Sequence, residues 1–257
     1  MKTIHLNNKT IKLYDCIDEL PIINFQKYNK YLLIDAGLGS DANSIDTHIV
    51  NIAKYIQKND RAKAIQELQN LRQSMHLIVS NVSPKYMAFA ALIHSIDGKK
   101  LDDLSDDNLR SIIEKLNEVP HGFITSVLFD LKKKLSTDLE TYFPSEFESA
   151  KEKEAYSKLK ARTILQLQEI ADEIDNAERI DEIDKALFDL KKPRNFAGKT
   201  SEEIKYDKQF ESACMLISQK AGMNAKKMTT LEFYSVMDNI SKQLEAERKV
   251  YNSHKKN

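Results

Sequence analysis

The chain has 257 residues, and its 39 Lys and Arg are balanced by 39 Asp and Glu, so its formal charge is zero. This balance argues against a nucleic-acid partner, because domains that bind phosphates usually carry a strong basic excess. Six Gly and five Pro leave few positions for tight turns or phosphate-binding loops, and they favour long helices. We find neither a signal peptide nor a run of the roughly 20 apolar residues that cross a bilayer, so we expect no membrane contact and a protein kept in the cytosol.

The first segment of the chain predicts a β-hairpin. From Thr3 to Tyr14, apolar and polar residues alternate around the pair Asn7-Asn8. A two-stranded ribbon is marginal in water and leaves unpaired edges, so we expect it to lie on a helical layer or to pair with a strand of another chain. The candidate interface residues of this hairpin are Ile4, Leu6, Ile11 and Leu13.

Helical periodicity dominates the remainder of the N-terminal half. A first helix is expected over Leu20–Ala36, with a stop at Gly37. Two helices follow, and the short break Asn59-Asp60 between them favours antiparallel packing. Their apolar residues recur three and four apart; they are Ile45, Ile49, Ile52 and Ile56 in one helix and Ile65, Leu68, Leu71, Met75 and Ile78 in the other.

The least polar segment is Tyr86–Ile96, which follows the helix start signal Ser83-Pro84. We interpret it as the helix at the centre of the N-terminal core, because most of its circumference is apolar. Two further helices are predicted, one over the apolar positions of 109–116 and one over those of 123–135. The expected fold class is mainly α, with an N-terminal β-hairpin followed by a helical bundle domain.

Pro144 marks the expected domain boundary, because it interrupts the helical pattern and the composition becomes more charged after it. The first domain is then 1–143, the β-hairpin with the helical bundle. The second domain is 144–257, a charged region of long helices that ends in a helix pair. Near its end, Thr229 and Glu232 form a capping box, and Met228 and Phe233 are placed to close a hydrophobic staple.

The second domain is expected to begin with one long, charged helix. It runs from the capping box Ser145–Glu148 to about Ala177, and it measures about 45 Å at 1.5 Å per residue. Its apolar stripe is narrow, which fits a seam between helices. The partner is either another subunit or, within the chain, the segment Ile180–Leu190. The candidate interface residues of the stripe are Leu159, Ile164, Leu167, Ile170 and Ile174.

No motif indicates a catalytic or ligand-binding site. Cys16 and Cys214 are far apart, and none of the six His has another His four residues away on a helix. The oxygen-rich loop Asp35–Asp46 lacks the spacing of an EF-hand, and Gly37-Leu38-Gly39 lacks the rest of a nucleotide-binding fingerprint. We therefore expect no enzymatic activity, no cofactor and no metal; an enzyme with a dispersed site is the alternative from another class.

Two segments resemble proteins of tailed bacteriophages. The segment LPIINFQKYNKYLLIDAG, Leu20–Gly37, resembles uncharacterised structural-cluster proteins of these phages, in particular the crAss-like phages of the gut. The segment Met228–Tyr234 is similar to a threonine-capped, aromatic segment near the end of some phage tail-assembly proteins. Neither segment contains a catalytic motif.

The resemblance implies a virion structural protein, a ring or adaptor subunit of the neck between the portal and the tail. Such a protein is a homo-oligomer with portal or tail subunits as partners, and it lies in the virion after synthesis in the host cytoplasm. The alternative is a tail-assembly chaperone that binds a helical client. The residues alone are compatible with a ring, because ring contacts are heterologous and the hairpin and the long helix would supply two such surfaces.

Overall fold

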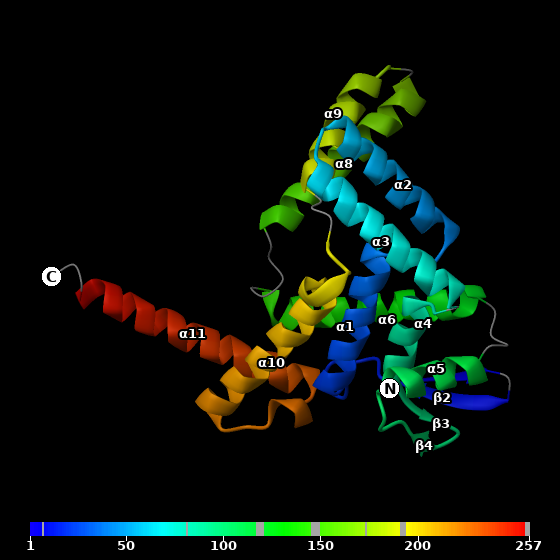
Figure 1. Ribbon diagram of the computed structural model, residues 1–257. Coiled ribbons are helices and arrows are strands. Elements are labelled where there is room, and N and C mark those ends of the chain that lie inside the picture. The colour runs from blue at the N-terminus through cyan, green and yellow to red at the C-terminus, as the bar shows by residue number, and fades with distance from the viewer. Residues whose placement is uncertain are drawn as a thin grey trace. The chain divides into compact units, whose positions relative to one another are not determined.

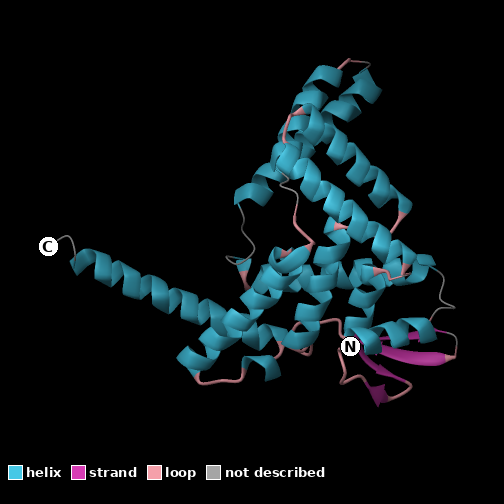
Figure 2. Cartoon of the chain, in the orientation of Figure 1, coloured by secondary structure: helices cyan, strands magenta, loops and turns pink. Residues whose placement is uncertain are grey.

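The computed structural model describes residues 1–6, 8–80, 82–116, 121–144, 150–172, 174–190 and 194–254 (Figure 1). The expected fold class is confirmed, because the structure is 74% helical and has a small antiparallel sheet that includes the N-terminal hairpin (Figure 2). None of the described helices is both long enough and apolar enough to span a membrane.

The chain divides into two compact units, which we call the main unit and the insert. The main unit consists of Met1–Phe143 and Asn195–Asn257, and the insert of Pro144–Arg194. The strands are β1 (Lys2–Leu6), β2 (Lys9–Leu13), β3 (Ile93–Ile96) and β4 (Lys99–Lys100). The helices of the main unit are α1 (Ile22–Gly37), α2 (Ala42–Gln57), α3 (Arg61–Val79), α4 (Pro84–Ala91), α5 (Asp106–Lys115), α6 (His121–Tyr142), η1 (Gly198–Thr200), α10 (Glu202–Ala221), η2 (Ala225–Lys227) and α11 (Thr230–His254). Those of the insert are α8 (Ala150–Asp172) and α9 (Ala177–Leu190).

The end of the chain departs from the expected second domain, 144–257. The division after Phe143 coincides with the expected boundary, but Asn195–Asn257 belongs to the main unit. Phe196 is buried there, and Phe233 and Ile240 of α11 belong to the same hydrophobic core as α1 and α4. Charge content marks where the composition changes, but it does not reveal which distant helices share a core.

The long helix expected to reach about Ala177 corresponds to α8, which ends at Asp172, and the expected segment Ile180–Leu190 lies in α9. The residues 174–176 between α8 and α9 are not helical. Within this connection, the Asn176 N–H donates to Glu169 (3.0 Å) and the Asn176 side-chain amide donates to the Leu165 carbonyl (3.3 Å). The first bond satisfies a backbone N–H that the start of α9 leaves unpaired, and the second ties Asn176 to the middle of α8. The capping box expected at 145–148 lies outside the described residues.

The predicted N-terminal hairpin is confirmed, and it is part of a larger sheet. β1 and β2 are antiparallel, with Ile4 opposite Ile11. β2 also pairs with β3, and β3 with β4, so the strand order is β1-β2-β3-β4. The prediction of one helix over Tyr86–Ile96 is therefore wrong beyond Ala91, where α4 ends.

The pair Asp97-Gly98 is the sequence signal for this second hairpin. Both residues have positive φ, 50° and 79°. Asp-Gly is a preferred pair for the two-residue turns that match the twist of antiparallel strands. The Asp97 carboxylate also accepts a hydrogen bond from the Thr10 N–H (2.8 Å), which ties the turn to β2. Local turn chemistry thus overrides the helical appearance of the apolar run before it.

The core of the main unit is centred on α4 and the start of β3, and the prediction that this segment is core is confirmed. Every residue from Met87 to Ile93 is at most 1% exposed. The side-chain amide of Asn24 in α1 donates to the Ala91 carbonyl (2.9 Å) at the end of α4. The Tyr14 N–H, just after β2, donates to the Leu92 carbonyl (2.9 Å). The hairpin, α1 and α4 therefore form one packed body.

The capping box at the start of α11 is confirmed. The Thr229 N–H donates to the Glu232 carboxylate (2.9 Å), and the Glu232 N–H donates to the Thr229 hydroxyl (3.3 Å). The next residue, Thr230, donates its N–H to the Leu20 carbonyl (2.8 Å). The start of α11 and the segment just before α1 are therefore bonded to each other in the main unit.

Candidate assembly surfaces

The four hairpin residues expected at an interface lie in the core of the main unit. Ile11 and Leu13 are fully buried, and Ile4 and Leu6 are buried as well. The edge of β2 that was expected to be unpaired is bonded to β3. The expectation that the ribbon has only two strands is thus wrong. The strand that extends it, β3, lies about 80 positions further along the chain, and the residues near the hairpin do not indicate this pairing. These four residues are unavailable to another chain.

The five residues expected at an interface in the insert are exposed. Four of them lie on α8 and Ile174 follows in the connection, and their exposed fractions range from 45% to 79%. We call this surface the α8 stripe; it consists of Leu159, Ile164, Leu167, Ile170 and Ile174. The hairpin with α9, which was the alternative use of these residues, forms through a different side of α8. Leu165 and Leu187 are buried there, and Arg162 Nε forms an ion pair with Asp184 (2.6 Å).

The interior of the insert is small. Among its described residues, the buried apolar side chains are Leu165 and Leu187. Burying one such side chain contributes roughly 1.5 to 3 kcal/mol, and small units with so little core usually depend on additional burial. The α8 stripe is the surface that offers it.

A second exposed apolar surface lies on α2 and α3, where the sequence predicted the helices but not their orientation. Both helices and the short break between them are confirmed. Five of their regularly spaced apolar residues, however, point to solvent, with exposed fractions of 50% to 64%, while Ile45, Ile52 and Leu71 are half-buried. We call this surface the α2–α3 stripe; it consists of Ile49, Ile56, Ile65, Leu68 and Met75. The residues that these helices bury are mostly polar or small: His48, Tyr55, Ala64, Glu67, Asn70 and Ser74.

A charged pair lies at the centre of this buried polar side. His48 Nδ1 donates to Glu67 (2.8 Å), and His48 Nε2 donates to the Leu38 carbonyl (2.9 Å). Both partners are acceptors, so both ring nitrogens carry protons and the imidazole is positively charged. Glu67 also accepts hydrogen bonds from the side-chain amides of Asn51 (3.0 Å) and Asn70 (3.2 Å). The carboxylate is therefore fully bonded although it is buried.

The pKa values of the pair follow from a balance between burial and these bonds. Burial lowers the pKa of His48, but the hydrogen bonds to Glu67 and to the Leu38 carbonyl outweigh it and raise that pKa above its usual value. Burial raises the pKa of Glu67, and the bonds from His48 and Asn51 outweigh it, so this pKa lies below its usual value. Both shifts favour the charged form of the group.

The polar network continues from α3 to the segment where the chain returns from the insert. Asn70 accepts a hydrogen bond from the Phe196 N–H (3.3 Å), and Gln66 donates to the Asn195 side chain (3.0 Å). The Phe196 ring occupies the space beside Gly37, where an added Cβ would lie 2.1 Å from the ring. Gly37 is therefore required for this close approach. Polar contacts, the Phe196 ring and Leu77, which packs against the core, hold the inner side of α3, and the apolar stripe is not used for this purpose.

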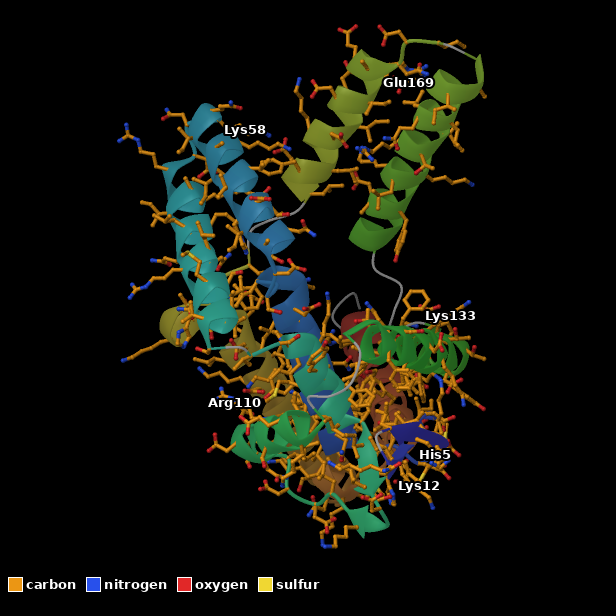
Figure 3. All side chains as sticks on the ribbon, turned by 90° about the vertical axis from the view of Figure 1, so that its right-hand side faces the viewer. His5, Lys12, Lys58, Arg110, Lys133 and Glu169 are labelled. Carbon is orange, nitrogen blue, oxygen red and sulfur yellow. The ribbon has the colours of Figure 1, made fainter. Side chains whose placement is uncertain are left out.

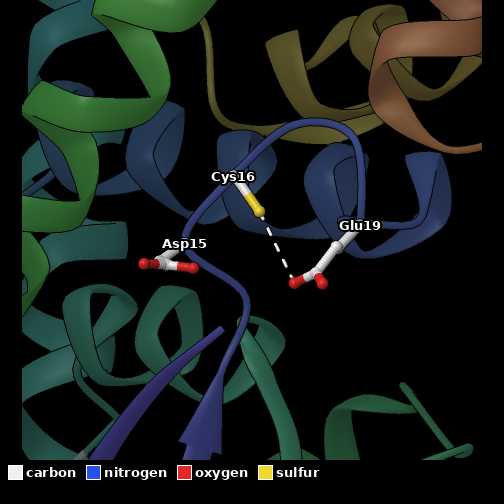
Figure 4. Close-up of side chains that lie close together, drawn as sticks. All are labelled: Asp15, Cys16 and Glu19. Carbon is white, nitrogen blue, oxygen red and sulfur yellow. Dashed lines mark hydrogen bonds between the residues drawn. The ribbon is translucent and has the colours of Figure 1, made fainter.

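One group of side chains has a composition that metals accept, Asp15, Cys16 and Glu19, with ligand atoms within 4.8 Å of one another. The Cys16 thiol donates to Glu19 (3.5 Å; Figure 4). Burial and the carboxylates of Asp18 and Glu19 raise the pKa of this thiol to about 12, whereas a metal ligand is a thiolate. The Met1 amine bridges Asp15 (2.8 Å) and Glu19 (3.0 Å) and neutralises them. The arrangement is that of a salt-bridge cluster.

A cavity of about 150 Å³ in the main unit is lined by Tyr31, Asp106 and Glu203 together with apolar residues. The Tyr31 hydroxyl donates to Asp106 (2.7 Å), which also forms an ion pair with Lys27 (2.5 Å). Tyr31 and Asp106 thus bond to each other, and Gln73, Arg110 and Glu203 complete the polar lining. Pockets for small molecules usually measure about 300 to 1,000 Å³, so this cavity favours packing over substrate binding.

Comparison of the chain with protein-family models, with curated proteins and with solved structures gave no match.

Proposed function

We propose that this chain is a non-enzymatic structural protein of a phage virion, a ring or adaptor subunit of the neck between portal and tail. The observation that carries the proposal is the pair of exposed apolar stripes on two separate helical hairpins. Each stripe is on a hairpin that is already held by other contacts, so folding of the single chain leaves the stripes available. The resemblance of Leu20–Gly37 and Met228–Tyr234 to phage proteins supplies the biological setting.

The physical argument concerns the cost of such surfaces. Large aliphatic side chains gathered on one helical face are rarely left in water, and contiguous patches of this kind usually mark interaction sites. A subunit with two different patches forms heterologous contacts, which generate a closed ring when the rotation between neighbours closes. This geometry supports homo-oligomerisation, and the phage resemblance adds portal or tail subunits as proposed further partners. The protein would be made in the host cytoplasm and incorporated into the virion.

The test is the assembly state of the purified full-length chain, alone and mixed with a purified portal. Size-exclusion chromatography with light scattering gives the mass, and electron microscopy shows whether the particle is closed. We expect a ring of fixed mass, either alone or in the presence of the portal. A chain that remains monomeric in both samples contradicts the proposal.

The second candidate is a tail-assembly chaperone, favoured by the α2–α3 stripe because two antiparallel helices can take a third, amphipathic helix between them. A chaperone remains monomeric and binds its client transiently. A synthetic amphipathic helix that binds the monomer at the α2–α3 stripe, in a chain that forms no ring, would favour this function.

A further inference from the structure

The two rows of the α2–α3 stripe lie on the same side of the hairpin. Ile49 and Ile56 are seven residues apart on α2, and Ile65, Leu68 and Met75 follow helical spacing on α3. Each row lies about a quarter turn from the side through which the two helices contact each other. The helices are consecutive and pack against each other, so the rows flank one shallow groove on the side opposite to Asn70 and its polar network. One further helix fits such a groove in a three-helix packing.

The α8 stripe has the form of a helix that fits such a groove. From Leu159 to Ile170 it extends about 17 Å along the helix at 1.5 Å per residue, against about 24 Å for the whole of α2. Its residues point away from α9, because α8 contacts α9 through Leu165. The stripe can therefore enter a groove while the α8–α9 hairpin remains intact.

The ends of the two hairpins carry opposite charge. At the end of the α2–α3 hairpin four basic residues stand against one acid; they are Lys54, Lys58, Arg61 and Lys63 against Asp60. Lys58 directly follows α2 (Figure 3). Around the connection between α8 and α9, five described acids stand against two bases; they are Glu169, Asp175, Glu178, Asp181 and Glu182 against Arg179 and Lys185, which pairs with Asp181. Glu169 lies near the end of α8 (Figure 3).

This complementarity decides between possible pairings. Two α2–α3 hairpins, or two inserts, that pack in parallel bring like charges together, which repulsion disfavours. In an antiparallel pair, the charged end of each copy meets no opposite charge. When an α2–α3 hairpin pairs with an insert, the basic end of the first meets the acidic end of the second, and the two apolar stripes lie beside these charges. Resting on the ring function proposed above, we infer that the insert of one copy docks on the α2–α3 hairpin of the next copy, with the α8 stripe in the groove.

The contact is thus head-to-tail: each copy gives its insert to one neighbour and receives the insert of the other. This predicts a specific result for two complementary variants. The first, Ile56→Glu with Leu68→Glu, damages the α2–α3 stripe and leaves the insert intact. The second, Leu167→Glu with Ile170→Glu, damages the α8 stripe and leaves the α2–α3 hairpin intact.

Each variant alone is expected to be a monomer, with self-association weakened at least about 100-fold by the loss of two apolar contacts. An equimolar mixture is expected to form a 1:1 dimer and nothing larger, because the intact insert of the first variant meets the intact hairpin of the second. Light scattering and sedimentation velocity measure both states. The dimer is also expected to weaken between 0.1 and 1 M NaCl, because salt screens the charged ends.

A matched control places the same charge on exposed apolar positions outside both stripes. Phe129 on α6 and Met215 on α10 are exposed by 67% and 61%, and Phe129→Glu with Met215→Glu is expected to assemble as the wild type does. Circular dichroism and melting of all three variants confirm that the chains are folded.

Three outcomes overturn the inference. If either stripe variant alone still forms the wild-type ring, the subunit contact lies elsewhere, while the ring function stands. If the mixture of variants forms no dimer, the two stripes do not dock on each other. If both variants are monomers with clearly lower melting temperatures than the wild type, the stripes are covered within one chain. The ring function itself fails only if the wild type forms no ring with or without the portal.

Discussion

Helices α1 and α2 follow each other in the chain and have 16 residues each, yet they place their apolar sides differently. α1 buries Phe25 and Tyr28 in the core of the main unit. α2 buries His48 and Tyr55 and leaves Ile49 and Ile56 in solvent. Periodic spacing reveals that a helix has an apolar side, but tertiary contacts decide whether the same chain covers it. A helix that is held by its polar side retains its apolar side for a partner.

The largest difference in the free energy of unfolding is expected between one substitution in the core around α4 and one on the exposed side of α2. Leu92 is fully buried at the end of α4. Leu92→Asp leaves a cavity and buries a carboxyl without a partner, so we expect a loss of about 4 kcal/mol or more in the free energy of unfolding. Thermal and urea denaturation followed by circular dichroism measure the loss.

The matched control is Ile56→Asp, at a residue of α2 that is 64% exposed. Its free energy of unfolding is expected to change by less than about 0.5 kcal/mol. A comparable loss in both variants would show that the α2–α3 stripe is buried in solution.

The buried pair in the α2–α3 hairpin gives the next largest effect. Glu67→Ala leaves the His48 imidazolium buried without its carboxylate, which costs about 3 kcal/mol. Replacing both residues, His48→Leu with Glu67→Leu, is expected to cost less, because no buried charge remains. If the double variant is less stable than Glu67→Ala, the pair contributes through packing and not through charge.

The same pair makes stability depend on pH. The pKa of His48 is raised in the folded chain, so its contribution is complete below the ordinary His pKa and is lost as the pH rises through the folded value. The lowered pKa of Glu67 acts on the acid side: its contribution is complete above the ordinary Glu pKa and is lost as the pH falls through the folded value. The pair therefore stabilises the fold most at pH values between the ordinary pKa of Glu and the ordinary pKa of His.

Melting temperatures measured from pH 6 to pH 9 test whether the contribution of His48 to stability is lost as the pH rises. The wild type is expected to lose stability across this range, and His48→Gln is expected to show a flatter profile. The Met1 amine, whose pKa is raised to about 10, loses its charge mainly above this range. Identical slopes in wild type and variant would contradict the assignment of the charge to His48.

The smallest change in the free energy of unfolding is expected from substitutions in the α8 stripe of the insert. Leu167 and Ile174 are exposed by 59% and 50%, so Leu167→Glu with Ile174→Glu should change the free energy of unfolding by less than about 0.5 kcal/mol. Leu165→Glu, on the buried side of α8, should be clearly more destabilising. A loss of several kcal/mol in the first variant would show that the α8 stripe packs inside the chain.

The sequence predicted the elements that local chemistry determines. The hairpin at 3–14 and the capping box at Thr229 are confirmed because alternation and reciprocal capping act over a few residues. The pairing of β2 with β3 and the return of α11 to the core depend on contacts between distant segments, which periodicity does not encode. The α8 stripe is recognisable in the sequence because charged residues surround it. The exposure of the α2–α3 stripe is not, because the buried role of His48 and Glu67 requires knowledge of their mutual contact.

The bond between Leu20 and Thr230 joins residues 210 positions apart, and it has a consequence for biosynthesis. The turn that packs on the start of α1 is among the last parts of the chain to leave the ribosome, after roughly 10 to 50 s of synthesis at 5–20 residues per second. Until then α4 can cover α1, but the ring of Phe25 lacks the Tyr234 ring, whose centroid lies 6.2 Å away in the folded chain. The main unit thus completes folding only after translation of nearly the whole chain, and any nascent chain shorter than about 230 residues exposes a surface prone to aggregation.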